Sequence, residues 1–359
     1  MLVESSNRCL KYFEAIREAT DQCLAHDPNV YLMGLGVPDP KGVFGTTLGL
    51  AKKHGADRVL DMPAAENGMT GVAIGSALVG MRPIMVHQRM DFTLLAMEQL
   101  VNQAAKWHYM FGGNGKVPLC VRMIVGRGWG QGPQHAQSFQ AWLAHIPGLK
   151  VVMPTTPHDA KGLLIASVED DNPVIFIEHR WLHGISGHVP EEMYRVPIGK
   201  ARVAREGKDI TIACVSYMAL EALRAADLLA RMGVEAEVID LRTIRPLDQE
   251  TIIASVRKTG RLIVTDTGWT TCGVSAEITA MVAERALGAL KAAPRRMALP
   301  DVPIPTTRAL ADLIYPRARD LARAVLEMMR RDAPDWPDLA DDPSHGRLDV
   351  PDPGFTGPF

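Results

Sequence analysis

The sequence predicts an α/β protein with two doubly wound domains, each a mostly parallel sheet with helices on both faces. Strand-like and helix-like segments alternate along the chain, stop alternating between residues 179 and 207, and then alternate again. The apolar run at 117–125 is almost unbroken, as expected for a strand that is covered on both faces. We therefore expect a first domain at 1–185, a linker at 186–207 and a second domain at 208–331.

The elements of the first domain follow from periodicity and from the residues that bound them. Apolar residues three to four apart predict helices, and short apolar runs between turn residues predict strands. Asp91 is placed to cap a long helix. In chain order we expect helix 10–24, strand 30–34, a loop and helix at 42–54, strand 58–61, a turn that carries Glu66 and a glycine-studded helix that runs to about 80, strand 82–86, helix 92–107, strand 117–125, strand 149–154, helix 158–168 and strand 173–178.

The second domain repeats the alternation with the same signals. We expect strand 209–215, helix 218–232, strand 236–240, helix 248–258, strand 262–265, helix 273–287 and a last helix at 318–329. The tail at 332–359 is rich in Pro, Asp and Gly and has little apolar periodicity, so we expect it to be extended or disordered.

Composition indicates an ordinary globular protein. The chain has 359 residues, 47% apolar and 22% charged, with a net charge of −2 that argues against nucleic acid as a partner. No apolar run reaches the length of a membrane span, and no secretory signal is visible. The five cysteines are scattered without a paired motif, which is typical of reduced thiols and predicts a cytoplasmic location.

One carboxylate, Glu66, lies where a predicted strand ends and a glycine-studded helix begins. Small residues follow at positions 68, 71, 75, 76 and 80, so the helix would present a smooth face to another backbone or a flat ligand. Each Gly inside a helix costs roughly 0.5–1 kcal/mol relative to Ala, so several of them need a packing reason. The ordinary alternative is a core helix whose preceding Glu is solvated or caps the N-terminus.

His135 follows a glycine-rich loop at 126–133, which is too irregular for a helix. Histidine titrates near neutral pH and is suited to proton transfer. A structural histidine after a loop is the alternative.

Several motifs, in order, resemble a known family from residue 5 to about 330. They are Ala65-Glu66-Asn67-Gly68, Gly80-Met81-Arg82-Pro83, Gln134-His135-Ala136-Gln137, Asp171-Asn172-Pro173, Pro197-Ile198-Gly199-Lys200-Ala201 and Asp240-Leu241-Arg242-Thr243-Ile244-Arg245-Pro246. Together they are similar to the β subunit of thiamin-diphosphate-dependent 2-oxoacid dehydrogenase E1 components. The resemblance implies a transketolase-like pyrimidine-binding domain followed by a transketolase C-terminal-like domain.

The resemblance implies specific roles for three residues. Glu66 would hydrogen-bond the pyrimidine ring of thiamin diphosphate and favour the tautomer that accepts a proton from the reacting carbon. Phe92 would stack on the same ring; a core Phe is the alternative. His135 would line the substrate channel and relay protons. Two departures from pyruvate-type members are the polar run at 86–91 and Thr306, where an aromatic-containing segment is usual.

The resemblance also implies a structural potassium ion near the end of the first domain. Asp170 and Asn172 match the family positions, with Leu119 and Ser167 as carbonyl donors. Hard oxygen ligands suit such a cation. An Asp-Asn turn before a strand explains the same residues.

A missing motif points to a partner chain. Family members hold Mg²⁺ and the diphosphate with a Gly-Asp-Gly motif, which this sequence lacks. The chain should therefore hold half of the cofactor, and an α subunit should hold the Mg²⁺ and the diphosphate in a heterotetramer of two α and two β subunits. The resemblance also implies that the second domain can dock a lipoyl acyltransferase (E2).

The sequence thus predicts a β subunit that, with its α partner, decarboxylates a small 2-oxo acid and passes the acyl unit to lipoamide. The C-terminal half of a split transketolase-like carboligase, moving a two-carbon unit, is the alternative, because it would use the same residues. A non-catalytic scaffold subunit is the third. Which 2-oxo acid is used does not follow from the sequence.

Overall fold

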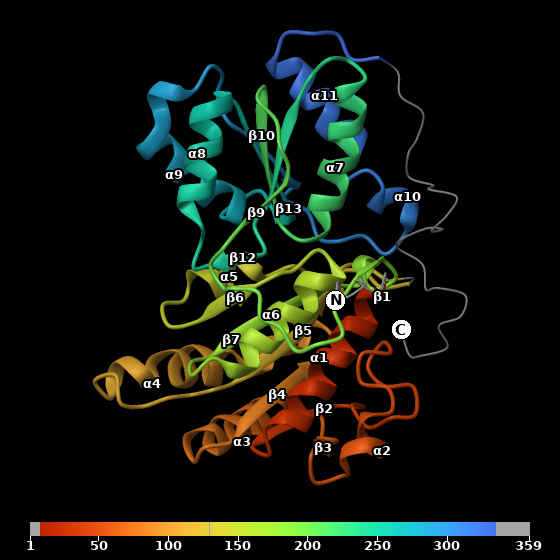
Figure 1. Ribbon diagram of the computed structural model, residues 1–359, viewed down its shortest axis with the longest axis vertical. Helices are drawn as coiled ribbons and strands as arrows, with labels where there is room; N and C mark the ends of the chain where they lie inside the picture. Colours follow the sequence, from red (N-terminus) through yellow and green to blue (C-terminus); the bar gives the residue numbers. More distant parts are fainter. Residues whose placement is uncertain (1–7, 129, 335–359) are drawn as a thin grey trace, which may run out of the picture. The chain divides into compact units, whose positions relative to one another are not determined.

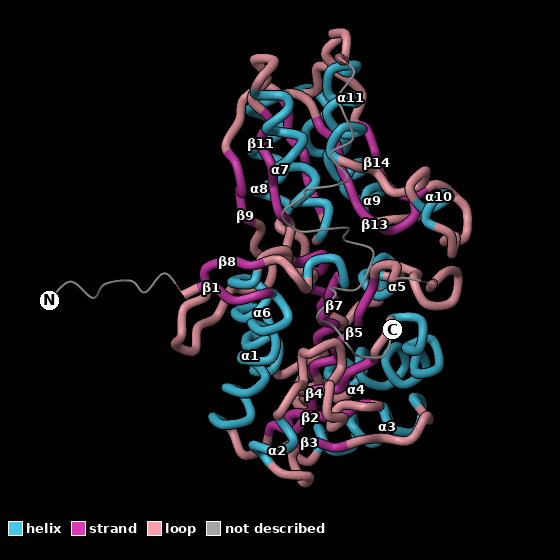
Figure 2. Tube along the Cα trace, turned by 90° about the vertical axis from the view of Figure 1, so that its right-hand side faces the viewer, coloured by secondary structure: helices cyan, strands magenta, loops and turns pink. Residues whose placement is uncertain are grey.

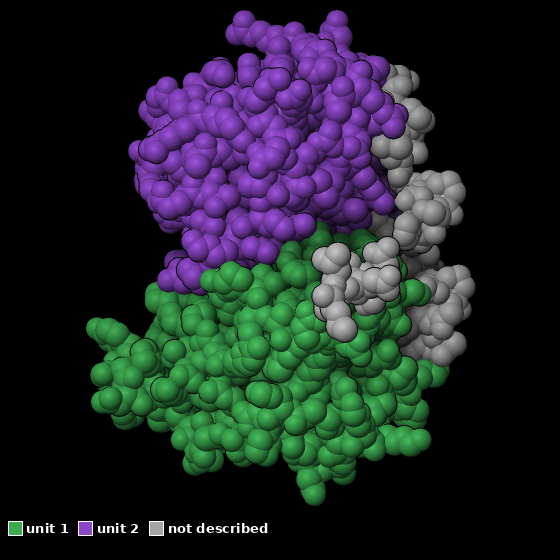
Figure 3. Space-filling view, viewed as in Figure 1, with its two compact units in different colours: residues 1–124, 146–198, 351–359 green, residues 125–145, 199–350 purple. Residues whose placement is uncertain are grey.

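The computed structural model describes residues 8–128 and 130–334, and its contacts divide the chain into two units (Figures 1 and 3). Among the described residues, the first unit comprises 8–124 and 146–198, and the second comprises 125–145 and 199–334. Both units are α/β, which confirms the predicted fold class. The predicted boundary at 185 did not anticipate that 125–145 packs with the second unit.

The first unit is built on parallel strands whose order is β6 (Lys150–Val152), β7 (Val174–His179), β5 (Cys120–Val125), β4 (Arg82–His87), β2 (Val30–Gly34) and β3 (Val59–Leu60). Every residue of β2, β5 and β7 is buried, because helices cover both faces of the sheet. Figure 2 shows helices α1 (Tyr12–His26) and α6 (Pro157–Glu169) on one face and α3 (Glu66–Leu78) and α4 (Ala105–Met110) on the other.

Short elements complete the first unit. They are helix α2 (Leu50–His54), the 3₁₀ turn η3 (Arg180–Leu182), and an antiparallel pair formed by β1 (Cys9–Lys11) and β8 (Ser186–His188). The pairing of β8 shows that the expected linker is partly strand. Backbone hydrogen bonding to β1 satisfies its polar groups.

The second unit has a sheet in the order β14 (Arg295–Leu299), β13 (Leu262–Trp269), β10 (Ile210–Cys214), β11 (Ala236–Asp240) and β9 (Arg202–Arg205). Its strands pair in parallel except for β9, which is antiparallel to β11 and also lies within the expected linker. Helix α7 (Tyr217–Ala230) packs on α11 (Ala318–Met328), and α8 (Gln249–Thr259) packs on α9 (Val274–Ala286). Figure 1 shows these two pairs on opposite faces.

The remaining elements of the second unit are short. They are α5 (Gln140–His145), β12 (Thr243–Arg245), η4 (Leu287–Ala289) and α10 (Arg308–Ala311). The predicted tail lies outside the described residues from 335 onward. No helix among the described residues is long and apolar enough to cross a membrane.

The long helix predicted at 92–107 is wrong in its detail. The segment begins as a 3₁₀ helix, η1 (Met90–Ala96), continues as a π-helix, η2 (Gln99–Ala104), and becomes regular only in α4. Asp91 lies inside the first turn, and Arg89 is the N-cap residue. The tighter 3₁₀ winding keeps Asp91 and Thr93 buried, and such irregular winding is common at functional sites.

Candidate functional site

Glu66 is the first residue of α3, at the point where the chain turns from strand β3 into the helix. The side chain is 9% exposed, and its carboxylate has no hydrogen-bond or ion-pair partner among the described residues. The partial positive charge of the helix N-terminus favours an anion there. The structure therefore holds a largely buried acid whose hydrogen-bonding capacity is unused within the described chain.

The glycines of α3 do not pack inside the subunit. A Cβ atom added at Gly68, Gly71 or Gly75 would meet no atom within 4 Å. Val72 and Val79, on the same exposed face, are 56% and 82% exposed. The core-helix alternative is wrong for these glycines, since the face they line is open.

Phe92 lies in η1, which packs against α3 and β4. The elements that carry Glu66 and Phe92 are thus in contact within the first unit. Phe92 is half-buried, and the neighbouring Leu95 is 65% exposed. A half-buried ring can offer one face to a ligand.

His135 lies on the second unit, in the loop 126–139 that joins β5 to α5; residue 129 is outside the described residues. His135 is exposed, and Gly132 and Ala136 beside it are buried. Its backbone N–H donates to the carbonyl of Gly132 at 3.2 Å. The imidazole is therefore presented to solvent by a loop whose backbone is held in place.

The predicted potassium ligands lie together at the amino ends of β5 and β7 in the first unit. The carbonyl of Leu119 accepts the N–H of Val174 at 2.9 Å, and the hydroxyl of Ser167 donates to Leu163. The carboxylate of Asp170 accepts from the N–H of Asn172 at 2.9 Å and from the ammonium of Lys150.

Arg82 brings further positive charge to the same place. Its guanidinium donates to the carbonyls of Val168 and Asp170 at 3.2 and 3.1 Å. These carbonyls retain a second lone pair, so they can still face a cation. No cluster of three or more His, Cys, Asp or Glu side chains able to hold a metal occurs among the described residues.

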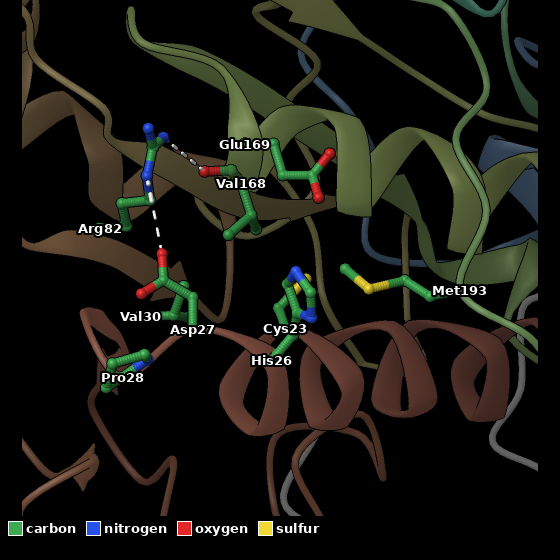
Figure 4. Close-up of a pocket in the computed structure, with 9 residues that line it drawn as sticks. All are labelled: Cys23, His26, Asp27, Pro28, Val30, Arg82, Val168, Glu169 and Met193. Atoms are coloured by element: carbon green, nitrogen blue, oxygen red, sulfur yellow. Dashed lines mark hydrogen bonds and ion pairs between the residues drawn. The ribbon is translucent and has the colours of Figure 1, made fainter.

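A cavity of about 270 Å³ lies beside this region, between α1 and the end of α6 (Figure 4). Cys23, Arg82 and Met193 are among its lining residues. Burial raises the pKa of the Cys23 thiol to about 12, so that thiol is unreactive. Neither Glu66 nor Phe92 lines the cavity, and we assign it no part in the chemistry.

Sequence reasoning missed a buried polar group in the first unit. Arg122 and Glu178 are fully buried on neighbouring strands, with Arg122 Nε donating to Glu178 at 2.7 Å. His183 lies 3.3 Å from the other carboxylate oxygen. Burial opposes ionisation of Glu178, yet Arg122 and His183 hold its pKa below the usual value. A lone Arg inside the apolar run at 117–125 was the available signal.

Two buried histidines are uncharged near neutral pH. Burial lowers the pKa of His87 to about 4, and burial lowers the pKa of His183 to about 4 against the opposing contact with Glu178. His183 also stacks on the ring of Tyr12 at 5.8 Å. Both are core residues with no exposed face for a substrate.

The fold and these elements define a transketolase-type protein. Residues 9–184 match the transketolase pyrimidine binding domain, and residues 199–321 match the transketolase C-terminal domain. A split gene transketolase, an inactive beta4 tetramer, has a TM-score of 0.74 and 22% identity over 90% of this chain and 99% of its own; this likeness concerns the fold alone.

Curated relatives narrow the class. The β subunit of acetoin:2,6-dichlorophenolindophenol oxidoreductase from Cupriavidus necator is 45% identical over 88% of this chain and 96% of its own length. The Bacillus subtilis protein of that name is 39% identical over 90% and 98%. The mitochondrial pyruvate dehydrogenase E1 component subunit beta-2 from Oryza sativa is 42% identical over 89% and 86%. The chain belongs to this family of β subunits, which confirms the resemblance.

Proposed function

We propose that the chain is the β subunit of a heteromeric, thiamin-diphosphate-dependent enzyme of the 2-oxoacid dehydrogenase E1 type. The observation that carries the proposal is Glu66, a largely buried and unpaired carboxylate at the start of α3 in a pyrimidine-binding domain. Its environment fits an aminopyrimidine, because a ring nitrogen can use the hydrogen bond that the chain leaves unused.

The residues of this chain bind and orient the cofactor, which supplies a carbanion-forming carbon when bound. Glu66 would hold a proton between its carboxylate and the pyrimidine ring, in a charge-assisted bond worth roughly 1.5–3 kcal/mol. Phe92 would stack on the ring and contribute about 0.5–1.5 kcal/mol beyond burial. His135 would move a proton to or from the substrate.

An α subunit would complete the site. The exposed face of α3 combines three open glycines with exposed Val72 and Val79, and an apolar face of small residues lets another backbone approach closely. We propose that the α subunit docks on this face and brings the Mg²⁺ and diphosphate ligands that the chain lacks. Two copies of each would form the heterotetramer.

The substrate class is the part of the proposal that needs an experiment. The chain would be purified with its α partner, with thiamin diphosphate and Mg²⁺ added, and assayed for CO₂ release from small 2-oxo acids with lipoyl domain or dichlorophenolindophenol as acceptor. Release of CO₂ that depends on thiamin diphosphate supports the proposal. Turnover of sugar ketols with an aldose acceptor would instead establish the carboligase, and no thiamin-dependent turnover on any substrate would leave only a scaffold.

A second substrate class is favoured by one observation. Two of the relatives are named for acetoin, a hydroxyketone. Oxidative cleavage of a hydroxyketone would reduce the same dye without releasing CO₂. Dye reduction by acetoin in the absence of CO₂ would therefore select this activity within the same family. Lipoyl-domain dependence of the turnover would decide whether an E2 core is a partner.

We further propose a monovalent cation at Leu119, Ser167, Asp170 and Asn172. The carbonyl-rich environment supports it, although Lys150 and Arg82 already supply positive charge there. Replacing K⁺ by choline should lower the melting temperature of the complex by a few degrees. An unchanged melting temperature would show that Lys150 and Arg82 supply the positive charge there without a bound cation.

We propose a cytoplasmic location for the enzyme. The support is that all five cysteines are free thiols, as expected in a reducing compartment. Cell fractionation tests the assignment.

A further inference from the structure

We propose that Asp266, Gln140 and Thr306 of the second unit are positioning residues for His135, so that the C-terminal domain holds the histidine-bearing loop for catalysis. The inference rests on the proposed function for its kinetic part and on the structure of the second unit alone for the rest.

The first attachment is a buried hydrogen bond. Gln140, the first residue of α5, donates from Nε2 to Oδ1 of Asp266 on β13 at 2.8 Å. Both side chains are at most 1% exposed. Gly268 leaves the space for this pair, since a Cβ there would lie 2.8 Å from Gln140 Nε2 and 3.0 Å from Asp266 Oδ2.

The second attachment is a close backbone approach. A Cβ on Gly132 would lie 2.2 Å from Oγ1 of Thr306 and 3.2 Å from its Cα, so only glycine fits. Gly132 is three residues before His135.

A third attachment is aromatic. Phe139, at the end of the loop, lies 6.2 Å from the ring of Trp269, centroid to centroid, and stacks on Trp142 at 4.9 Å. Arg245 also donates to the carbonyl of Ala144 in α5 at 3.1 Å. The loop is thus fixed on both sides of His135 by residues more than 100 positions away.

These contacts offset the backbone flexibility of the glycine-rich loop that carries His135. The loop contains Gly126, Gly128, Gly130 and Gly132, and fixing each residue costs roughly 1–2 kcal/mol of backbone entropy. A catalytic side chain must nonetheless be held within a fraction of an ångström. Contacts on both sides of the exposed His135 hold it in position although the loop around it is rich in glycine.

The Gln140–Asp266 pair is better suited to orientation than to stability. Oε1 of Gln140 is buried and has no hydrogen-bond partner among the described residues. Burying an unsatisfied polar atom is unfavourable, so an apolar pair of similar size would avoid that cost. The directional bond fixes one orientation of α5, and therefore of the loop that ends at it.

The test compares four variants of the full chain: Asp266→Ala, Gln140→Ala, Asp266→Asn, which keeps an acceptor, and Ser255→Ala. Ser255 hydrogen-bonds Thr211 at 2.6 Å elsewhere in the second unit and is the matched control. Hydrogen exchange of peptides within 126–139 should accelerate at least about tenfold in the two Ala variants at the pair. It should be unchanged in Asp266→Asn and Ser255→Ala. Unchanged exchange in the Ala variants at the pair would overturn the proposal.

The same variants in the assembled complex give the kinetic arm. Asp266→Ala should lower kcat about tenfold with little change in KM, and it should lower kcat no further in a His135→Ala background. An equal drop in both backgrounds would mean a merely structural role and would overturn the proposal. If the unmodified complex shows no thiamin-dependent turnover, the proposed function is contradicted. The hydrogen-exchange result would still decide whether the loop is anchored.

A second pair of variants, at Gly132 and Thr306, tests the proposal even if the variants at Gln140 and Asp266 fail to fold. Gly132→Ala should lower kcat because its Cβ collides with Thr306. Adding Thr306→Gly, which removes the nearest atom, should restore part of it. No recovery in a folded double variant would count against the contact at Thr306.

Discussion

The two regions that carry the candidate site differ in how far this chain completes them. At Glu66 the site is incomplete, because the largely buried carboxylate has no hydrogen-bond or ion-pair partner among the described residues. The glycine face on the other side of α3 is uncovered. At His135 the loop is held by contacts within the second unit, and His135 itself is exposed. The first region therefore awaits a cofactor and a partner chain, whereas the second is built by the chain itself.

This difference predicts which substitutions act through assembly and which act through chemistry. Substitutions on the open face of α3 should leave the stability of the isolated chain unchanged and weaken its association with the α subunit. Changes at the anchored loop should act at the catalytic step once the complex has formed.

The largest effect is expected for Glu66→Gln. The amide keeps the size of the side chain but not its charge, so positioned proton transfer on the order of 10²–10⁴ in rate should be lost. Steady-state turnover of the complex measures the effect. Asp57→Asn, an exposed acid in the same unit, is the control. Near-normal turnover of Glu66→Gln would remove this residue from the mechanism.

The next effect is expected for Gly75→Leu. Leu is a better helix former than Gly by roughly 0.5–1 kcal/mol, and the site is open, so the free chain should be at least as stable. Association with the α subunit should weaken at least about 100-fold, because the side chain holds the two backbones apart. Analytical ultracentrifugation measures the association. Gly75→Ala keeps a small side chain and should still assemble; equal association of the Leu and Ala variants would refute docking at this face.

A smaller effect is expected for His135→Asn. The side chain is exposed, so the melting temperature should not change, while kcat should fall about 10–100-fold through loss of proton transfer. His188→Asn, an exposed histidine of the first unit, is the control. A variant with unaltered kcat and an unaltered pH profile would make His135 structural.

The free energy of unfolding should change with pH in opposite directions in the two units below about pH 6.5, and it should level off near neutral pH. His87 and His183 have folded pKa values of about 4, below the usual 6.5, so they stabilise the first unit above pH 6.5. That stability is lost as the pH falls towards 4, by about 3 kcal/mol for each histidine.

Asp266 acts in the other direction. Burial raises its pKa to about 6, in spite of the hydrogen bond from Gln140, so its contribution is greatest below about pH 4 and is lost as the pH rises towards 6. Urea unfolding at several pH values measures both trends. His87→Gln should reduce the first slope and Asp266→Asn the second. If the free energy of unfolding of the variants depends on pH as it does in the unmodified protein, His87 and Asp266 do not have the shifted pKa values that their burial causes.

The features that could be predicted from the sequence are those set by residues close together in the chain. The alternation of strands and helices, and a glycine-studded helix after the turn that carries Glu66, followed from turn residues and periodicity. That the helix already begins at Glu66 did not follow. The family resemblance supplied the site residues. The break of 92–107 into 3₁₀, π and α segments did not follow, because it depends on which of its side chains the sheet buries.

Contacts distant in sequence could not be foreseen. The packing of 125–145 with the second unit depends on Gln140 meeting Asp266 and on Gly132 meeting Thr306. Nothing in the spacing of those residues indicates that they touch. The open glycine face was likewise read as a packing surface, but the structure was needed to show that nothing in the subunit covers it.

A structure of the complex with bound thiamin diphosphate is the most direct test of the role of Glu66. A carboxylate oxygen of Glu66 should lie about 2.6–3.0 Å from the pyrimidine nitrogen opposite the amine. A carboxylate turned away from the ring, or a pyrimidine bound elsewhere, would contradict the proposed function.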